Sequence, residues 1–244
     1  MAVSTPTSLK TYNTTRTASA DTTSSFTPSA NALLVSVFQG VTTDTCTITD
    51  STGLTWTNIN TTTYNASNRY TVAYTQVGAS PSSMTVTATW GASFTGYVTG
   101  GVFQVTGHNT TTPLVAAGTK TGSGTSATFS TATVPALSSS GNLQVLVACS
   151  RGPGANPEAS WTSILGQAGV NCMTFAAYIG TPGDTSPTAT DSGATSRAYA
   201  ALAFEIADGG LALAPTGSDY TAQSGTATYY GVFDAFRGLV LVWP

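Results

Sequence analysis

The sequence predicts an all-β protein: two tandem antiparallel β-sandwich domains, Ig-like or jelly-roll in type, followed by a C-terminal arm. Composition, period-two alternation and an internal repeat all indicate this. Apolar residues make up 41% of the 244 residues and charged residues only 7%, whereas ordinary soluble domains are roughly one quarter charged. Thr, Ser, Ala and Gly replace the charges, and β-branched residues such as Thr favour pleated strands over helix interiors. No stretch has a convincing helical periodicity.

The first domain is expected over residues 1–112. Leu33, Val35 and Val37 alternate with smaller or polar residues, so they share one face of a strand. Further strand-like segments follow the polar start of the chain, and Gly, Ser, Asn and Pro separate them. The segments expected in this domain are Ser8–Thr15, Leu33–Val37, Leu54–Thr57, Arg69–Tyr74, Met84–Thr89 and Gly101–Val105.

The second domain, residues 113–208, repeats these segments in the same order, with some loops shortened. Self-similarity at domain length indicates duplication, because solenoid repeats are much shorter. Each unit then holds about seven short strands in roughly 100 residues, as antiparallel sandwiches do. The polar stretch Asn109–Pro113 is the expected boundary. The matching segments are Leu114–Lys120, Leu143–Val147, Ser160–Thr162, Cys172–Ala177, Ser186–Thr190 and Leu202–Ile206.

Residues 209–244 have no counterpart after the first domain and form the expected C-terminal arm. Gly209 and Gly210 give the arm freedom to swing away, and Leu239–Trp243 is almost wholly apolar. Such an end either adds a strand to its own second domain or docks on a neighbouring subunit. We expect the second, in a homo-oligomer such as a trimer or with another protein. The expected assembly contacts are Phe233, Phe236, Leu239, Leu241 and Trp243.

Charge and hydropathy narrow the possible partners and the compartment. The net charge is −3 and the basic residues are scattered singly, so no stripe can neutralise a nucleic-acid backbone. No apolar run approaches the ~20 residues that span a bilayer. The N-terminal residues show no signal-peptide pattern. We therefore expect neither nucleic-acid binding nor membrane insertion, and synthesis in a cytoplasm.

Residues able to carry catalysis or bind a metal are few. His108 is the only histidine, so a zinc site of the usual kind cannot be assembled, and no sequence around it indicates a Ser-His-Asp site. Asp44 with Asp50, and Asp184 with Asp191, are loop carboxylates that could bind calcium, although no EF-hand pattern is present. His108 is expected in a solvated turn or between the domains. We expect no enzyme activity and no cofactor.

Glu205 and the two repeated tryptophans have structural interpretations. Glu205 takes the place of Gln104 in the repeat, which predicts a surface strand position instead of a catalytic acid. Trp56 and Trp161 occupy equivalent places. They are expected to pack between the sheets of each sandwich, and the alternative is a platform on which a sugar stacks.

The three cysteines lack metal-binding spacing. Cys46 shares a face with Ile48, and Cys149 shares a face with neighbouring valines, which predicts buried thiols that act as small hydrophobes. The alternative is a disulfide between Cys149 and Cys172.

The strand pattern resembles that of β-sandwich proteins from the structural gene clusters of tailed bacteriophages. The segments that carry the resemblance are NALLVSVF, LTWT, RYTVAYTQVG, SMTVTAT and GGVFQVTG, followed by their degenerate second copy. Such proteins are minor tail or tail-tip components or capsid decoration proteins. The resemblance covers residues 1–208 but includes no invariant functional motif, so it transfers no site residue.

The resemblance implies a virion location, other virion proteins as partners and a host-surface glycan as a further possible ligand. The expected function is a non-enzymatic virion surface protein that aids host attachment, with the second unit and arm attaching it and the first unit projecting. Bacterial secreted adhesion modules show similar patterns, so the alternative is a carbohydrate-binding or adhesion module of a phage or bacterial surface. A sandwich-fold enzyme acting on polysaccharide is the least favoured class, because carboxylates are few.

Overall fold

The predicted all-β class is confirmed. The computed structural model describes residues 2–152, 154–169, 172–180, 183–210, 231–234 and 238–241, with only the backbone for the last two ranges and for several other strand residues. These residues form antiparallel sheets and contain no helix, in particular none of the length and apolarity needed to cross a membrane. Clustering of contacts separates a compact unit, Met1–Leu211, from Ala212–Pro244.

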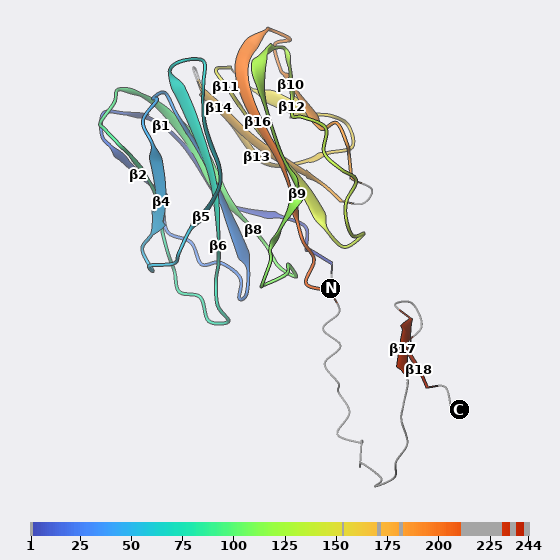
Figure 1. The fold of residues 1–244 in the computed structure, drawn as a ribbon. Coiled ribbons are helices and arrows are strands. Elements are labelled where there is room, and N and C mark those ends of the chain that lie inside the picture. The colour runs from blue at the N-terminus through green and yellow to red at the C-terminus, as the bar shows by residue number, and fades with distance from the viewer. Residues whose placement is uncertain are drawn as a thin grey trace. The chain divides into compact units, whose positions relative to one another are not determined.

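The first half of the compact unit contains two sheets (Figure 1). The large sheet has five strands in the order β1-β8-β3-β6-β5, and the small sheet has three in the order β2-β7-β4. The strands are β1 (Thr7–Arg16), β2 (Ala20–Thr22), β3 (Leu33–Gly40), β4 (Cys46–Asp50), β5 (Thr57–Tyr64), β6 (Asn68–Gln76), β7 (Val86–Trp90) and β8 (Gly96–Val105).

The second half follows the same strand order. Its large sheet is β9-β16-β11-β14-β13 and its small sheet is β10-β15-β12, so each strand corresponds to the one eight places earlier. The pairing of Val35 with Phe103 is matched by that of Val145 with Phe204. The strands are β9 (Leu114–Ser126), β10 (Thr128–Ser130), β11 (Leu143–Ser150), β12 (Ala155–Pro157), β13 (Thr162–Gly169), β14 (Cys172–Ile179), β15 (Thr188–Asp191) and β16 (Arg197–Ile206).

Each half has a hydrophobic core between its large and small sheets. In the first half, Leu34 and Phe38 of β3 pack with Trp90 of β7. In the second half, Leu146 of β11 packs with Phe129 of β10. Burial of these apolar side chains is the main force holding each pair of sheets together.

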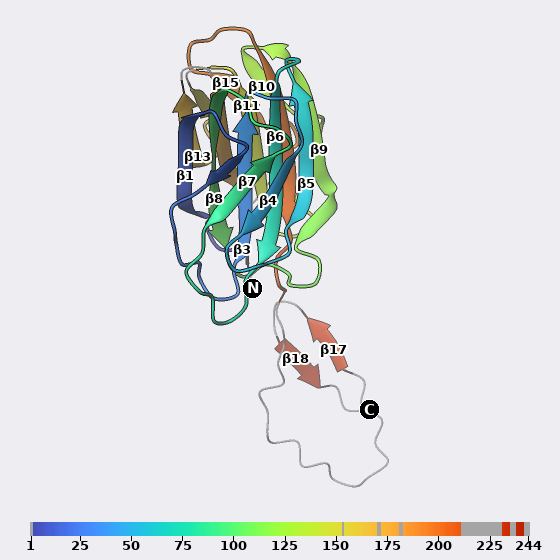
Figure 2. The same ribbon diagram turned by 90° about the vertical axis from the view of Figure 1, so that its left-hand side faces the viewer.

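A third core joins the two halves through their large sheets. It contains Leu33, Val35 and Val37 from β3 together with Val145 and Val147 from β11. These residues share one face of each strand, as predicted, but β3 and β11 are buried along both faces. The unit is therefore four sheets deep, small–large–large–small (Figures 1 and 2). The two halves therefore form one body, and the expected projection of the first half from a particle stays a prediction.

The strands β3 and β11 run in the same direction, so the unit has two distinct ends. At the proximal end, Val3 N–H donates to Gly141 O at 2.9 Å and Gly209 N–H donates to Gly107 O at 2.8 Å. At the distal end, where β3 and β11 finish, Gln39 Nε2 donates to Ser150 O at 3.1 Å. The described chain therefore enters and leaves the unit at the proximal end.

Beyond the compact unit, β17 (Gly231–Asp234) and β18 (Gly238–Leu241) form an antiparallel hairpin. Of the expected assembly contacts, Phe233 pairs with Leu239 in this hairpin, and Leu241 is the last residue of β18. Phe236 and Trp243 lie outside the described residues. The backbone of the hairpin is described, and the predicted side-chain contacts stay a prediction.

Candidate functional site

His108 lies at the proximal junction between the halves and is only 5% exposed. Its backbone forms an isolated bridge with Asp208, and its Nε2 lies 3.0 Å from Gln76 Oε1. Burial lowers the pKa of the imidazole from its ordinary value, which favours the neutral form. Of the two positions predicted for it, the structure shows the inter-half one. A glutamine amide can orient a histidine ring, but it lacks the negative charge with which the carboxylate of a Ser-His-Asp site stabilises the imidazolium.

Glu205 corrects the sequence-based prediction of a surface position, because it is only 2% exposed. Its Oε1 accepts hydrogen bonds from Ser138 N–H at 2.8 Å, Ser138 Oγ at 2.9 Å and Asn142 Nδ2 at 2.6 Å. Gln104 holds the matching loop of the first half in the same way, because its Oε1 accepts a hydrogen bond from Ser29 N–H. We call each of these two arrangements a clamp. The equivalence with Gln104 was correct, but both residues hold the loop that precedes the central strand of their half.

Asp50 and Trp56 form a structural pair in the first half. Asp50 accepts hydrogen bonds from the N–H and hydroxyl of Thr52, from Leu54 N–H and, at 2.8 Å, from Trp56 Nε1. Burial raises the pKa of Asp50, but these donors outweigh burial and the pKa is lowered overall. Because both carboxylate oxygens accept hydrogen bonds from this segment, Asp50 holds the β4–β5 loop closed.

Asp184 does the same for Trp161 in the second half. Its Oδ2 accepts from Trp161 Nε1 at 3.2 Å and its Oδ1 from Ser186 N–H at 2.8 Å. Burial and the neighbouring Asp184 raise the pKa of Glu158. Burial also acts to raise the pKa of Asp184, but hydrogen bonds from its donors, which include Glu158, lower that pKa overall. A proton taken up by this pair therefore resides on Glu158. Trp161 is 5% exposed, so it is the predicted core tryptophan, whereas Trp56 is half-buried.

The other carboxylates that the sequence suggested for calcium binding also accept hydrogen bonds from residues of their own loops. Asp191 accepts from Gly193 N–H at 2.9 Å and pairs with Arg197 Nε at 2.9 Å. Asp44 accepts from Thr42 Oγ1 at 3.0 Å. Among the residues that the structure describes, no group of three His, Cys, Asp or Glu side chains could hold a metal ion.

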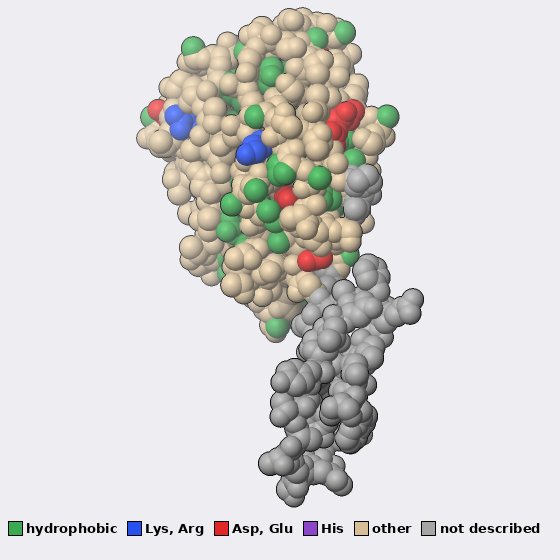
Figure 3. All heavy atoms as spheres, turned by 45° about the vertical axis from the view of Figure 1, so that its right-hand side comes forward, with side chains coloured by type: hydrophobic (Ala, Val, Ile, Leu, Met, Phe, Trp, Pro, Cys, Tyr) green, Lys and Arg blue, Asp and Glu red, His purple; other side chains and the backbone are tan. Residues whose placement is uncertain are grey.

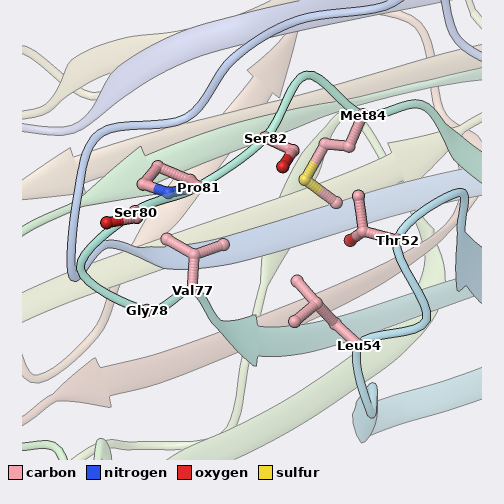
Figure 4. Close-up of a pocket in the computed structure, with 8 residues that line it drawn as sticks. All are labelled: Thr52, Leu54, Val77, Gly78, Ser80, Pro81, Ser82 and Met84. Carbon is pink, nitrogen blue, oxygen red and sulfur yellow. The ribbon is translucent and has the colours of Figure 1, made fainter.

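One shallow hollow, of about 170 Å³, opens between the β4–β5 and β6–β7 loops (Figure 4). Leu54, Val77 and Met84 form its apolar part, and Thr52, Ser80 and Ser82 supply hydroxyls. Its described lining includes neither an acid nor a base, so it offers contacts without a proton-transfer group.

A second hollow, of about 220 Å³, lies beside the free edge of β4. We call it the β4 hollow. It is bounded by β4, by Trp56 and Asn58 around the start of β5, and by Thr71 and Ala73 of β6. Its walls combine apolar side chains with hydroxyl and amide groups. Burial raises the pKa of the Cys46 thiol, which lines this hollow, to about 12, so the thiol stays protonated and unreactive at neutral pH.

The backbone of β4 presents unpaired groups to this hollow. Gly91 N–H donates to Thr45 O at 2.9 Å and Ser51 N–H donates to Thr85 O at 3.1 Å, at the two ends of the β4–β7 pairing. Hydrogen-bonded pairs alternate along antiparallel strands. Cys46, Ile48 and Asp50 therefore direct their N–H and C=O groups away from β7, toward the free edge.

A buried polar cluster crosses the distal end of the shared core. The hydroxyls of Thr99 and Thr174 lie 2.7 Å apart, and Thr174 Oγ1 donates to Gln39 Oε1 at 3.2 Å. The amide of Gln39 also contacts the Tyr64 hydroxyl. These bonds fix the register between the two large sheets, because a shifted register would leave buried polar groups unpaired.

The cysteine predictions are answered in part. Cys149 is fully buried in the shared core and Cys46 is partly buried. The side chain of Cys172 lies outside the described residues, so its pairing with Cys149 stays a prediction.

No protein-family model, no curated protein and no solved structure matches this chain.

Proposed function

We propose that the protein is a non-enzymatic structural component of a tailed-phage virion, exposed on the particle surface as a minor tail, tail-tip or capsid decoration protein. The observation that carries the proposal is the layout of the chain. A compact all-β unit begins and ends at its proximal end, and an apolar segment follows in sequence. Such a unit can be held at one end while the loops at the other end stay accessible to a host surface.

The fold supports a duplicated origin. We infer that residues 1–112 and 113–208 are two copies of one eight-stranded jelly-roll sandwich. The two strand orders correspond strand for strand, and the pairing of β1, β8, β3 and β6 beside that of β2, β7 and β4 has jelly-roll connectivity. The copies pack through their large sheets, as two subunits of a symmetric dimer do.

The use of the ionisable groups supports a non-enzymatic role. Asp50, Asp184 and Glu205 accept hydrogen bonds from their own loops, and His108 is neutral and bonded to an amide. On the face that Figure 3 shows, charged side chains are few, in line with a chain in which only 7% of the residues are charged. Such surfaces repel one another weakly, which suits a protein held in an assembly.

Residues 209–244 are the proposed assembly arm, with Phe233, Phe236, Leu239, Leu241 and Trp243 as its contacts. Burial of one such large apolar side chain contributes roughly 1.5–3 kcal/mol, so several together can anchor a subunit. The partners are other copies of this chain, in a homo-oligomer, and other virion proteins.

A carbohydrate-binding module is the second candidate, and one observation favours it. Trp56 is half-buried and borders a hollow that also contains Asn58 and Thr71. An aromatic ring beside amide and hydroxyl groups is a combination suited to sugars. Titration of glycan arrays with the full chain and with Trp56→Ala tests it: binding that this change abolishes would favour the second candidate.

The test of the main proposal is to locate the protein in particles. Antibody labelling of purified phage particles from cells that carry the gene, viewed by electron microscopy, should place the chain on the particle surface. Recovery of the protein only outside the particle fraction would refute the proposal.

A further inference from the structure

The sheet edges of the compact unit differ in how well they are protected against pairing with another chain. An exposed edge is a template for a further strand, and proteins block it with irregularity, shortness or proline. The large-sheet edges β1, β5, β9 and β13 all lie in pairings interrupted by a register shift. The small-sheet edges β2, β10 and β12 have three residues each. Among the described edges of this unit, β4 alone is longer than three residues and pairs without a register shift over its whole length.

The second half shows how the edge equivalent to β4 is blocked. Ser192 N–H donates to Gly154 O at 3.0 Å, so alternation directs the backbone of Ala155 and Pro157 outward from β12. Proline has no N–H to offer, and its place on an outward-facing edge position is a recognised block. Ile48 holds the equivalent position in β4, opposite Ala88, as Pro157 lies opposite Ala189. The outward N–H at Ile48 is therefore available where its counterpart is removed.

The β4 hollow marks the place where a further strand would lie. In the jelly-roll arrangement proposed above, a fourth strand would follow β4 in the small sheet. Here β5 pairs with β6 in the large sheet instead, so β4 is left as the edge (Figure 2). Part of the large sheet next to β4, including Thr71 and Ala73, then borders the hollow.

We propose that the free edge of β4 is the acceptor site for the β18 strand of a second copy of this chain, which pairs with β4 and covers the β4 hollow. This inference rests on the assembly role proposed for the arm and specifies its receptor. The contact is head-to-tail: each copy offers one strand and one edge, so it builds a ring or a chain of subunits.

The chemistry of β18 fits this edge. Leu239 and Leu241 fall on one face of the strand, because successive side chains alternate. The hollow has an apolar wall formed by Ile48, Trp56 and Ala73, which matches the apolar character of Leu239 and Leu241. A two-stranded hairpin such as β17–β18 is at best marginally stable alone in water, and pairing with β4 gives it a sheet to join.

A polypeptide strand suits the site better than a saccharide does. The row of outward N–H and C=O groups on β4 has the spacing of a second backbone. The indole N–H of Trp56 is already bonded to Asp50, which leaves fewer donors for sugar hydroxyls. Loss of assembly on adding a free saccharide would point to the saccharide instead and would overturn the inference.

Cys46→Pro in the full chain tests the edge directly. It removes an outward N–H without removing a bond to β7, as Pro157 does in the second half. Cys46→Ala is the matched control, because it also removes the thiol but keeps the N–H. By analytical ultracentrifugation we expect wild type and Cys46→Ala to form the same oligomer of the 24.7 kDa chain. Cys46→Pro should dissociate at about tenfold or more higher concentration, as loss of one or two backbone bonds implies.

A cross-link between copies keeps the inference testable if Cys46→Pro does not fold. In a Cys46→Ala background, a tagged copy with Thr47→Cys is mixed with a second, differently tagged copy with Val240→Cys. Thr47 is exposed and Val240 is the residue between Leu239 and Leu241 in β18, so docking should allow a disulfide between the two tagged copies. If no cross-link joins the two tags, either with Thr47→Cys or with Thr49→Cys in its place, the inference is overturned.

The failure of this inference is distinguishable from the failure of the proposed function. If a chain ending at Leu211 loses assembly while folded Cys46→Pro assembles normally, the arm docks elsewhere and only the β4 site is wrong. If the full chain is monomeric at all concentrations, the assembly role itself is wrong.

Discussion

Because His108 is buried, it should make the stability of the fold depend on pH. Its pKa is lowered in the folded protein by burial, so between that pKa and the unfolded value of about 6.5 the unfolded chain binds more protons. Stability from this group is therefore present above pH 6.5 and is lost as the pH falls below it. Thermal unfolding at pH 7.5 and 5.5 should show a smaller loss on acidification in His108→Gln than in wild type. An identical loss in both would show that His108 does not titrate in the unfolding equilibrium.

Glu205 is the clearest case of a buried polar group fixed by its neighbours. Glu205→Ala should lower the free energy of unfolding by about 2 kcal/mol, because it leaves the Ser138 N–H and the Asn142 amide without their acceptor. Glu205→Gln keeps an oxygen acceptor, as Gln104 does in the first half, and should lose much less. Urea unfolding measures both, and equal losses would contradict the clamp.

At the scale of single residues, the sequence predicted which positions of the two halves correspond better than it predicted burial. It indicated correctly that Glu205 corresponds to Gln104. It could not show that Glu205 is buried, because the clamp needs Ser138 and Asn142 from a distant loop. The sequence also could not show that Trp161 is buried while Trp56 is half-buried, because the two residues occupy equivalent positions in the repeat.

At the scale of strands, the shared core depends on side chains that cross from one half to the other. Leu165 of β13 is fully buried in that core and approaches the Gly101 backbone of β8. Leu165→Ala should lower the free energy of unfolding by about 2–5 kcal/mol, the usual cost of such a cavity. Ser163→Ala, at an exposed position of the same strand, is the control and should change stability by less than about 0.5 kcal/mol. Similar small effects at both positions would show that the interface relaxes around the cavity.

Alternation in the sequence predicted which residues of β3 share a face, but not what covers each face. Leu33, Val35 and Val37 share one face, as predicted, and that face covers the other half. Leu34 and Phe38 are the residues that face the small sheet. A strand buried on both faces carries apolar residues nearly throughout, and this signal is present in Leu33–Phe38. The free edge of β4 has no such signal, because edge status is set by which strands pair.

At the scale of the whole molecule, the shared core should make the two halves unfold together. Residues of both halves contribute to one hydrophobic cluster and to the polar cluster around Gln39 and Thr174. Differential scanning calorimetry of the full chain should show one transition for the compact unit, with the calorimetric enthalpy equal to the van't Hoff enthalpy. Two resolved transitions would mean that each half is stable without the other.

The repeat predicted corresponding strands in the two halves, and the two strand orders match; the stretch Asn109–Pro113 lies between β8 and β9. It could not predict that the halves join into one unit, because an internal repeat carries no information on how its copies contact each other. That contact depends on the outer faces of two large sheets, and only the three-dimensional arrangement shows that they cover one another.

The common direction of β3 and β11 has a mechanical consequence. Gly209 leaves the unit at the proximal end, and the loops that follow β3 and β11 lie at the distal end. A pull between these two ends would run along the strands, perpendicular to the inter-strand hydrogen bonds. The bonds of a ladder would then share the load in shear instead of opening one after another. A tether at Gly209 thus directs tension along the axis on which antiparallel sheets resist rupture best.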